Sequence, residues 1–133
     1  MDFPKETIVL NAEEDIVKVR KCVKELAEKL RFKIIDQTKL ITAVSEMARN
    51  TIIHGGGGIA VIEVVNNNDN IGIKLFFEDK GKGIEDLSLA MKDGYTTGNG
   101  LGYGLGGTKR LVDEFYIESK PKEGTRVTFI KWK

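Results

Sequence analysis

Two polar side chains that could bind one ligand lie in the segment SEMARN, residues 45–50. Glu46 and Asn50 are four residues apart in a run of helix-forming residues, so a helix would place them on one face, one turn apart. One interpretation is that the carboxylate and the amide are aimed at one ligand. A solvated polar face is the commoner explanation of such a pair taken alone, so other residues have to decide.

A second candidate group ends an apolar segment. In EDKGKGI, residues 78–84, Asp79 comes shortly after two phenylalanines, and Gly81 and Gly83 keep the chain close to it. Aspartate before glycine is also ordinary turn chemistry, so this motif is weak evidence when it stands alone.

The third candidate is the glycine-rich segment DGYTTGNGLGYGLGG, residues 93–107, which carries seven of the chain's 15 glycines. Part of it, GYGLGG, matches the dinucleotide pattern G-x-G-x-x-G, but the residues before it cannot form the buried strand that this pattern needs. Walker and protein-kinase motifs are absent from the sequence. A helix is expected directly afterwards, which would let backbone N–H groups surround phosphate oxygens. A flexible surface loop is the alternative.

Hydrophobic periodicity predicts the elements that must position these groups. The helices are expected at 13–30 with Asn11 as a cap, at a second segment that Asp36 caps and glycines 55–58 end, near 86–92, and at 107–115. The strands are expected at 5–11, 59–65 and 71–79, and in the closing segments FYIESK and TRVTFIKW. This order predicts an α+β fold: a two-layer α/β sandwich with a mixed, mostly antiparallel sheet, helices on one face, and a single domain over 1–133.

The three motifs, in this order and at these spacings, resemble the N, G1 and G2 boxes of the GHKL (Bergerat) ATP-binding fold. That family includes gyrase B, Hsp90, histidine kinases and MutL. The resemblance covers essentially the whole chain, and Gly124–Thr125 fits a later threonine of the family. It implies ATP and Mg²⁺ as cofactors.

The resemblance also implies a role for each residue. Asp79 would accept a hydrogen bond from the adenine amino group, and Thr125 would assist through water. Asn50 would bind Mg²⁺, and Glu46 would be the general base. The remaining residues implied at the nucleotide are Gly81, Gly83, Ile84, Thr96, Thr97, Gly100, Leu101, Gly102, Gly104, Leu105 and Gly106.

The length of 133 residues favours the stand-alone branch of the family, the bacterial serine kinases of the anti-sigma-factor type. Within that branch the chain looks closest to the switch serine/threonine kinases of the stressosome pathway, which phosphorylate a STAS-domain antagonist or scaffold protein and activate a partner phosphatase. An anti-sigma factor that sequesters a sigma factor is one alternative. A non-catalytic ATP-binding module and an interaction domain without nucleotide are the others.

Composition narrows the partners. The 21 basic and 20 acidic residues nearly cancel, so nucleic acid is not expected as a partner. No apolar run approaches the roughly 18 residues that span a membrane, and we expect a cytoplasmic protein. Cys22 is expected to be a small buried core residue. His54 is expected to cap a helix C-terminus, with a nucleotide contact as the alternative.

Overall fold

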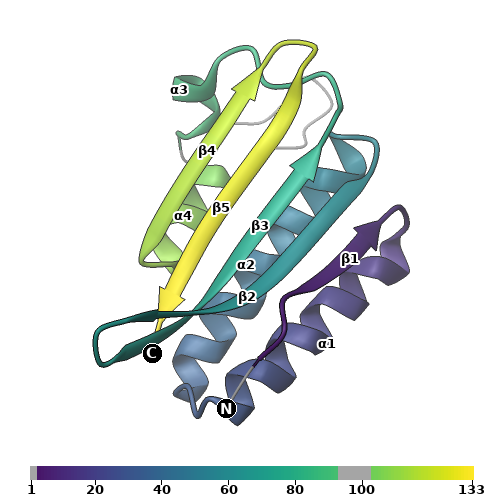
Figure 1. Cartoon of the computed structure of the whole chain (residues 1–133). Coiled ribbons are helices and arrows are strands. Elements are labelled where there is room, and N and C mark those ends of the chain that lie inside the picture. The colour runs from purple at the N-terminus through teal and green to yellow at the C-terminus, as the bar shows by residue number, and fades with distance from the viewer. Residues whose placement is uncertain (1–2, 93–102) are drawn as a thin grey trace.

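The computed structural model describes residues 3–92 and 103–133. These residues form two layers, a five-stranded sheet and a layer of helices that covers one of its faces (Figure 1). The strands are β1 (Glu6–Leu10), β2 (Gly58–Asn67), β3 (Asn70–Asp79), β4 (Glu114–Lys120) and β5 (Gly124–Trp132). The helices are α1 (Glu13–Lys29), α2 (Ile34–Ile53), the short α3 (Leu87–Ala90) and α4 (Leu105–Leu111).

The strand order is β1-β2-β3-β5-β4, and each neighbouring pair of described strands is antiparallel. The predicted two-layer sandwich is confirmed, and its mostly antiparallel sheet proves antiparallel in every described pairing. Because β3 is central, its end is flanked on both sides. Asp79 pairs with Gly58 of β2 on one side and with Thr125 of β5 on the other.

The core lies between the sheet and the helices. Alternate residues of the central strands point into it, and the rings of Phe77 and Phe129 stack there with centroids 5.9 Å apart. Leu40, Val44 and Met47 of α2 are completely or almost completely buried in the same core. This packing fixes the C-terminal half of α2 over the end of β3 and the beginning of β5.

Two predicted helix caps are wrong. Ala12, and not Asn11, precedes α1, and the carboxylate of Asp15 in the first turn accepts the N–H groups of both, at 2.9 Å for Asn11 and 3.0 Å for Ala12. Helix α2 begins at Ile34, so Asp36 lies within its first turn, 3.6 Å from Nζ of Lys131. In α1 an acid inside the first turn therefore replaces the expected cap, because free N–H groups and the helix dipole stabilise a carboxylate there, whereas in α2 the expected cap itself lies inside the first turn.

Two further expectations need correction. Helix α4 begins at Leu105 and ends at Leu111, not at Phe115, because the following residues pair with β5 as strand β4. Cys22 is half-buried instead of fully buried, and its thiol donates to Oε2 of Glu6 at 3.0 Å.

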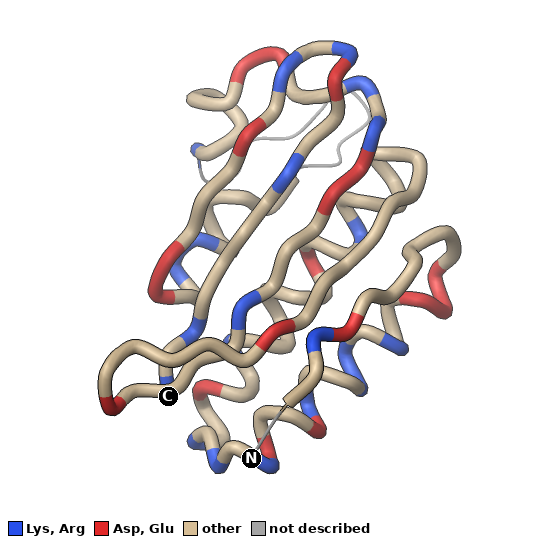
Figure 2. Tube along the Cα trace, viewed as in Figure 1, with Lys and Arg blue, Asp and Glu red and all other residues tan. Residues whose placement is uncertain are grey.

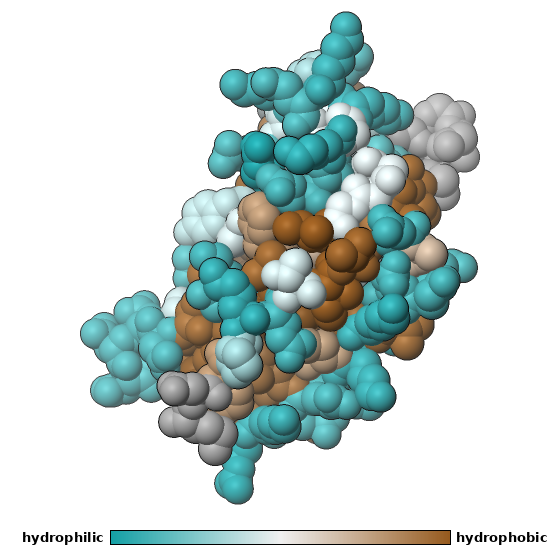
Figure 3. Space-filling view, turned by 45° about the vertical axis from the view of Figure 1, so that its right-hand side comes forward, coloured by the Kyte–Doolittle hydropathy of each residue, from teal (hydrophilic) through white to brown (hydrophobic). Residues whose placement is uncertain are grey.

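Basic and acidic residues are interspersed along the helices and strands (Figure 2). The sheet face opposite the helices bears apolar side chains as well. Val61, Phe76 and Thr128 lie side by side across three strands of it. The turned view shows an apolar area ringed by hydrophilic residues (Figure 3). Among the described residues, no helix combines the length and the hydrophobicity that a membrane crossing requires.

Candidate functional site

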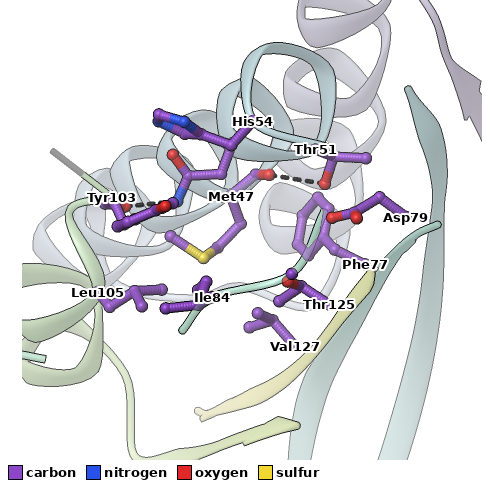
Figure 4. Close-up of a pocket in the computed structure, with 12 residues that line it drawn as sticks. Met47, Thr51, His54, Phe77, Asp79, Ile84, Tyr103, Leu105, Thr125 and Val127 are labelled. Carbon is purple, nitrogen blue, oxygen red and sulfur yellow. Dashed lines mark hydrogen bonds between the residues drawn. The ribbon is translucent and has the colours of Figure 1, made fainter. Parts of the chain in front are cut away.

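A cavity of about 30 Å³ lies where the C-terminal half of α2 meets the end of β3, the beginning of β5 and the beginning of α4 (Figure 4). Six residues that the sequence predicts at the nucleotide line it: Asn50, Asp79, Gly83, Ile84, Leu105 and Thr125. They come from four segments that are far apart in the sequence: α2, the motif at residues 78–84, α4 and β5. The fold therefore brings parts of all three motifs into one place.

Asp79 ends β3 and is half-buried, with Oδ1 accepting the N–H of Gly81 at 2.9 Å. Burial raises the pKa of this carboxyl above its ordinary value, and this outweighs the backbone N–H groups of Gly81 and Thr125, which lower it. The carboxylate is thus partly deprived of water at the edge of the cavity. A ligand that donates hydrogen bonds to it would replace that water.

Glycines hold Asp79 in place because no larger residue fits around it. A Cβ on Gly55 would overlap the side chain of Asp79 and lie 2.5 Å from its Oδ2. A Cβ on Gly124, whose φ is +85°, would overlap the carbonyl oxygen of Asp79. Gly81 packs on Gly55, where an added Cβ would lie 2.8 Å from its Cα. Gly81 therefore serves the site by close packing and does not itself line the cavity.

Glu46 and Asn50 lie one turn apart on α2, as predicted. Glu46 is outside the cavity lining, and its side chain is 41% exposed, with Oε1 3.8 Å from Nη1 of Arg49. Its other oxygen faces the residue that precedes α4. A Cβ on Gly104 would lie 2.7 Å from Oε2 of Glu46, and Gly104 has a φ of +65°, which favours glycine. The carboxylate thus lies against the end of the glycine-rich segment.

Asn50 contacts the same segment. Its side-chain amide donates through Nδ2 to the carbonyl oxygen of Tyr103 (Figure 4). The amide oxygen is the atom that would bind a cation. No cluster of three or more His, Cys, Asp or Glu side chains able to hold a metal ion occurs in residues 3–92 and 103–133. One amide oxygen fits Mg²⁺, which commonly keeps its water and is carried on substrate phosphates.

His54 occupies the C-cap position of α2, as predicted, and its N–H donates to the carbonyl oxygen of Asn50 at 2.9 Å. It also lines the cavity, where its ring lies against that of Tyr103 with centroids 4.4 Å apart and planes at 47°. Both roles considered for His54 are therefore compatible with its position.

Residues 35–133 match the family model of histidine kinase-, DNA gyrase B- and HSP90-like ATPases. The chain belongs to this family. Over 120 residues it is 44% identical to the serine/threonine-protein kinase RsbT of Bacillus subtilis (strain 168), with 90% of each chain covered. Over 119 residues it is 35% identical to an anti-sigma F factor of Thermoanaerobacter sp. (strain X514), which covers 85% of this chain and 82% of that protein.

Solved structures share the GHKL fold of the chain. The RsbU and RsbW domains of Rv1364c from Mycobacterium tuberculosis match with a TM-score of 0.65 at 19% identity, over 97% of this chain and 32% of that one. The catalytic domain of the histidine kinase ThkA matches with a TM-score of 0.53 at 15% identity, over 98% of this chain and 95% of that one. The predicted GHKL family is confirmed, and membership implies an ATP-binding domain.

Several residues of this GHKL site were not predicted. They are Met47, Thr51, Phe77, Tyr103 and Val127, whereas His54, which also lines the cavity, was considered as a nucleotide contact. Helical periodicity could have identified Met47 and Thr51, because they lie within one turn of Asn50 on α2. Tyr103 stands between two predicted glycines. Phe77 and Val127 are core residues of the strands and carry no separate signal.

The predicted phosphate-binding residues are only partly described. Leu105 and Gly106 are buried at the start of α4, directly after Gly104. Gly106 and Gly104 do not line the cavity. Thr96, Thr97, Gly100, Leu101 and Gly102 lie outside the described residues, so their role in the GHKL site stays a prediction.

Proposed function

We propose that this chain is a Mg·ATP-dependent protein serine/threonine kinase that transfers the γ-phosphate of ATP to a STAS-domain antagonist or scaffold protein. The observation that carries the proposal is the position of Glu46. Its carboxylate lies one helical turn from Asn50 and against Gly104, which directly precedes α4. This position near the amide of α2 and the end of the glycine-rich segment supports the assignment of Glu46 as the general base. The 44% identity to the kinase RsbT also supports the proposal that the chain is a protein kinase.

In the proposed reaction each group has a separate task. Asp79 accepts a hydrogen bond from the amino group of adenine, with Thr125 beside it. Ile84 and Leu105 exclude water from the adenine ring. Asn50 would hold Mg²⁺ through its amide oxygen, and the ion would neutralise charge on the phosphates. Glu46 takes the proton of the substrate's serine or threonine hydroxyl. At the same time the oxygen of that hydroxyl bonds to the γ-phosphorus, and the bond between the γ-phosphorus and the oxygen that bridges it to the β-phosphate breaks.

The partners follow from the same proposal. The substrate is a serine or threonine of a STAS-domain protein in sigma-factor or stress signalling, and release from that protein would let the kinase activate a partner phosphatase. We place it in the cytoplasm as a single kinase domain. Basic and acidic residues are interspersed along its helices and strands, which favours a protein partner over nucleic acid or membrane (Figure 2).

Transfer of radiolabelled phosphate from ATP to candidate STAS proteins tests the proposal. Glu46→Ala should keep the affinity for ATP and lose about 100-fold or more of the transfer rate, because general bases typically contribute at least that much. Glu28→Ala, an exposed glutamate of α1, is the matched control and should transfer at the normal rate. If Glu46→Ala transfers phosphate at the rate of the unaltered protein, Glu46 is not the general base.

A second candidate function is sequestration of a sigma factor. It is favoured by the anti-sigma F factors among the relatives, such as that of Clostridium novyi (strain NT), 40% identical over 102 residues. Co-purification from a bacterium that carries the gene distinguishes the two functions. A retained sigma factor supports sequestration, whereas a retained STAS protein supports the kinase.

A further inference from the structure

Ser119, on β4, lies behind the cavity and contacts three groups from other segments. Its hydroxyl accepts the N–H of Ile84 at 2.8 Å and donates to the carbonyl oxygen of Gly124 at 3.1 Å. The same oxygen lies 2.7 Å from Oγ1 of Thr125. Ser119 thus joins two predicted nucleotide-binding residues, Ile84 and Thr125, although it does not line the cavity itself.

The chemistry of these three partners decides where the hydroxyl protons lie. A hydroxyl has one proton to donate and can accept two hydrogen bonds. The N–H of Ile84 can only donate, and the carbonyl oxygen of Gly124 can only accept. The single proton of Ser119 is therefore committed to Gly124. The short contact with Thr125 is then a hydrogen bond only if Thr125 donates to Ser119.

This direction determines what Thr125 offers to the cavity. With its proton directed at Ser119, the Thr125 hydroxyl presents only lone pairs. Thr125 lies opposite Asp79 in the register of β3 and β5, and both side chains line the same end of the cavity (Figure 4). The ionised carboxylate of Asp79 is also an acceptor. Two acceptors side by side favour an exocyclic amino group, which has an N–H for each of them, and oppose an exocyclic oxygen in the same place.

We propose that Ser119 is a positioning residue that holds the hydroxyl of Thr125 as a hydrogen-bond acceptor, so that the cavity selects a 6-aminopurine over a 6-oxopurine. This inference rests on the proposed ATP-binding function and adds a residue outside the binding surface that determines base selectivity. A purine with oxygen at position 6 would direct its lone pairs at those of Asp79 and Thr125. Without Ser119, the Thr125 hydroxyl can turn and donate to that oxygen.

The test compares the affinities for Mg·ATP and Mg·ITP by calorimetry, because inosine carries an oxygen where adenosine carries an amino group. The unaltered protein should bind ATP more tightly than ITP. Ser119→Ala should reduce the ATP-to-ITP preference by roughly fivefold, the effect of one neutral hydrogen bond. Ser119→Thr keeps the hydroxyl and should retain the preference. Thr38→Ala, which removes an exposed hydroxyl near the start of α2, is the control and should also retain it.

A merely structural role of Ser119 predicts a different pattern. Thr125→Val removes the hydroxyl through which Ser119 acts, so it should lower the preference by a similar factor. Adding Ser119→Ala to Thr125→Val should change the ATP-to-ITP ratio no further, because both substitutions act on one group. A structural effect of Ser119→Ala would instead lower the melting temperature and both affinities by the same factor.

The outcomes separate this inference from the proposed function. If the unaltered protein binds ATP and folded Ser119→Ala keeps its full preference over ITP, the role of Ser119 is refuted and the proposed function stands. Should Ser119→Ala not fold, an unchanged preference in Thr125→Val refutes it equally. If the unaltered protein binds neither nucleotide, the proposed function and this inference fail together.

Discussion

Replacing Gly55 by alanine tests most directly whether packing holds Asp79 at the cavity. A Cβ at this position would overlap Cβ and Cγ of Asp79 and lie 2.5 Å from its Oδ2. Asp79 cannot simply withdraw, because it belongs to β3, which is paired with β2 and β5 on both sides. We therefore expect the side chain of Asp79 to rotate and its hydrogen bond with the N–H of Gly81 to break.

The expected magnitude has two overlapping sources. Overpacking of a tight site typically costs about 1–3 kcal/mol. A hydrogen bond to a charged group contributes about 1.5–3 kcal/mol. Because one rotation relieves the overlap and breaks the bond, the two costs are not additive, and we expect the free energy of unfolding to fall by about 2–3 kcal/mol. ATP loses its contact with the same carboxylate, so its affinity should fall roughly 10- to 100-fold.

Gly107→Ala is the matched control for this substitution. Gly107 lies within α4, and outside that helix an added Cβ there would meet no atom of residues 3–92 and 103–133 within 4 Å. Since alanine favours a helix more than glycine does, the control should gain up to about 1 kcal/mol of stability. Urea unfolding measures the free energy of each variant, and calorimetry with Mg·ATP measures its affinity.

Two results would refute the reasoning in different ways. If Gly55→Ala unfolds and binds ATP like the unaltered protein, while Gly107→Ala behaves as expected, Asp79 is not packed on Gly55 as described. If Gly55→Ala loses stability but keeps its affinity for ATP, the packing is correct and Asp79 does not contact the nucleotide.

Two further predictions concern ionisable groups. Burial raises the pKa of Asp79, so stability from this group is present at low pH and is lost as pH rises through the raised pKa. Asp79→Asn should therefore gain free energy of unfolding relative to the unaltered protein at pH 7 but not at pH 3, and should lose ATP affinity; an equal difference at both pH values would contradict this. Burial, followed by the carboxylate of Glu6, raises the pKa of the Cys22 thiol to about 12. The thiol of Cys22 should react with a disulfide reagent at pH 8 roughly a thousandfold more slowly than an ordinary thiol. The Glu6→Gln variant should react faster than the unaltered protein. A rate like that of free cysteine in the unaltered protein would show that the thiol is not shielded.

The local parts of the site could be predicted from the sequence. Glu46 and Asn50 share a helix face because the helical period is a local property of the backbone. Asp79 ends a strand whose apolar pattern stops there. The caps of α1 and α2 could not be predicted as easily, because a free N–H at a helix start can donate to any of several nearby acceptors. Asp15 replaces Asn11 in α1, and Asp36 lies inside the first turn of α2 instead of capping it.

Contacts between distant segments depended on strand register and helix packing. Gly55 packs on Asp79, Tyr103 contacts Asn50 and His54, and Ser119 contacts Ile84, and in each of these pairs the partners are more than 20 residues apart in the sequence. A shift of one residue in the register of β3 and β5 would turn Thr125 to the other face of the sheet. Local patterns do not encode such pairings.

The sequence by itself therefore determined the elements, the family and the chemical types of the groups at the site, because periodicity and short motifs are properties of neighbouring residues. The tertiary structure alone decided which glycines are obligatory, which oxygen accepts each proton, and that His54 lies both at a helix end and at the cavity. These features arise from close packing between segments, where a shift of less than 1 Å changes a hydrogen bond into an overlap.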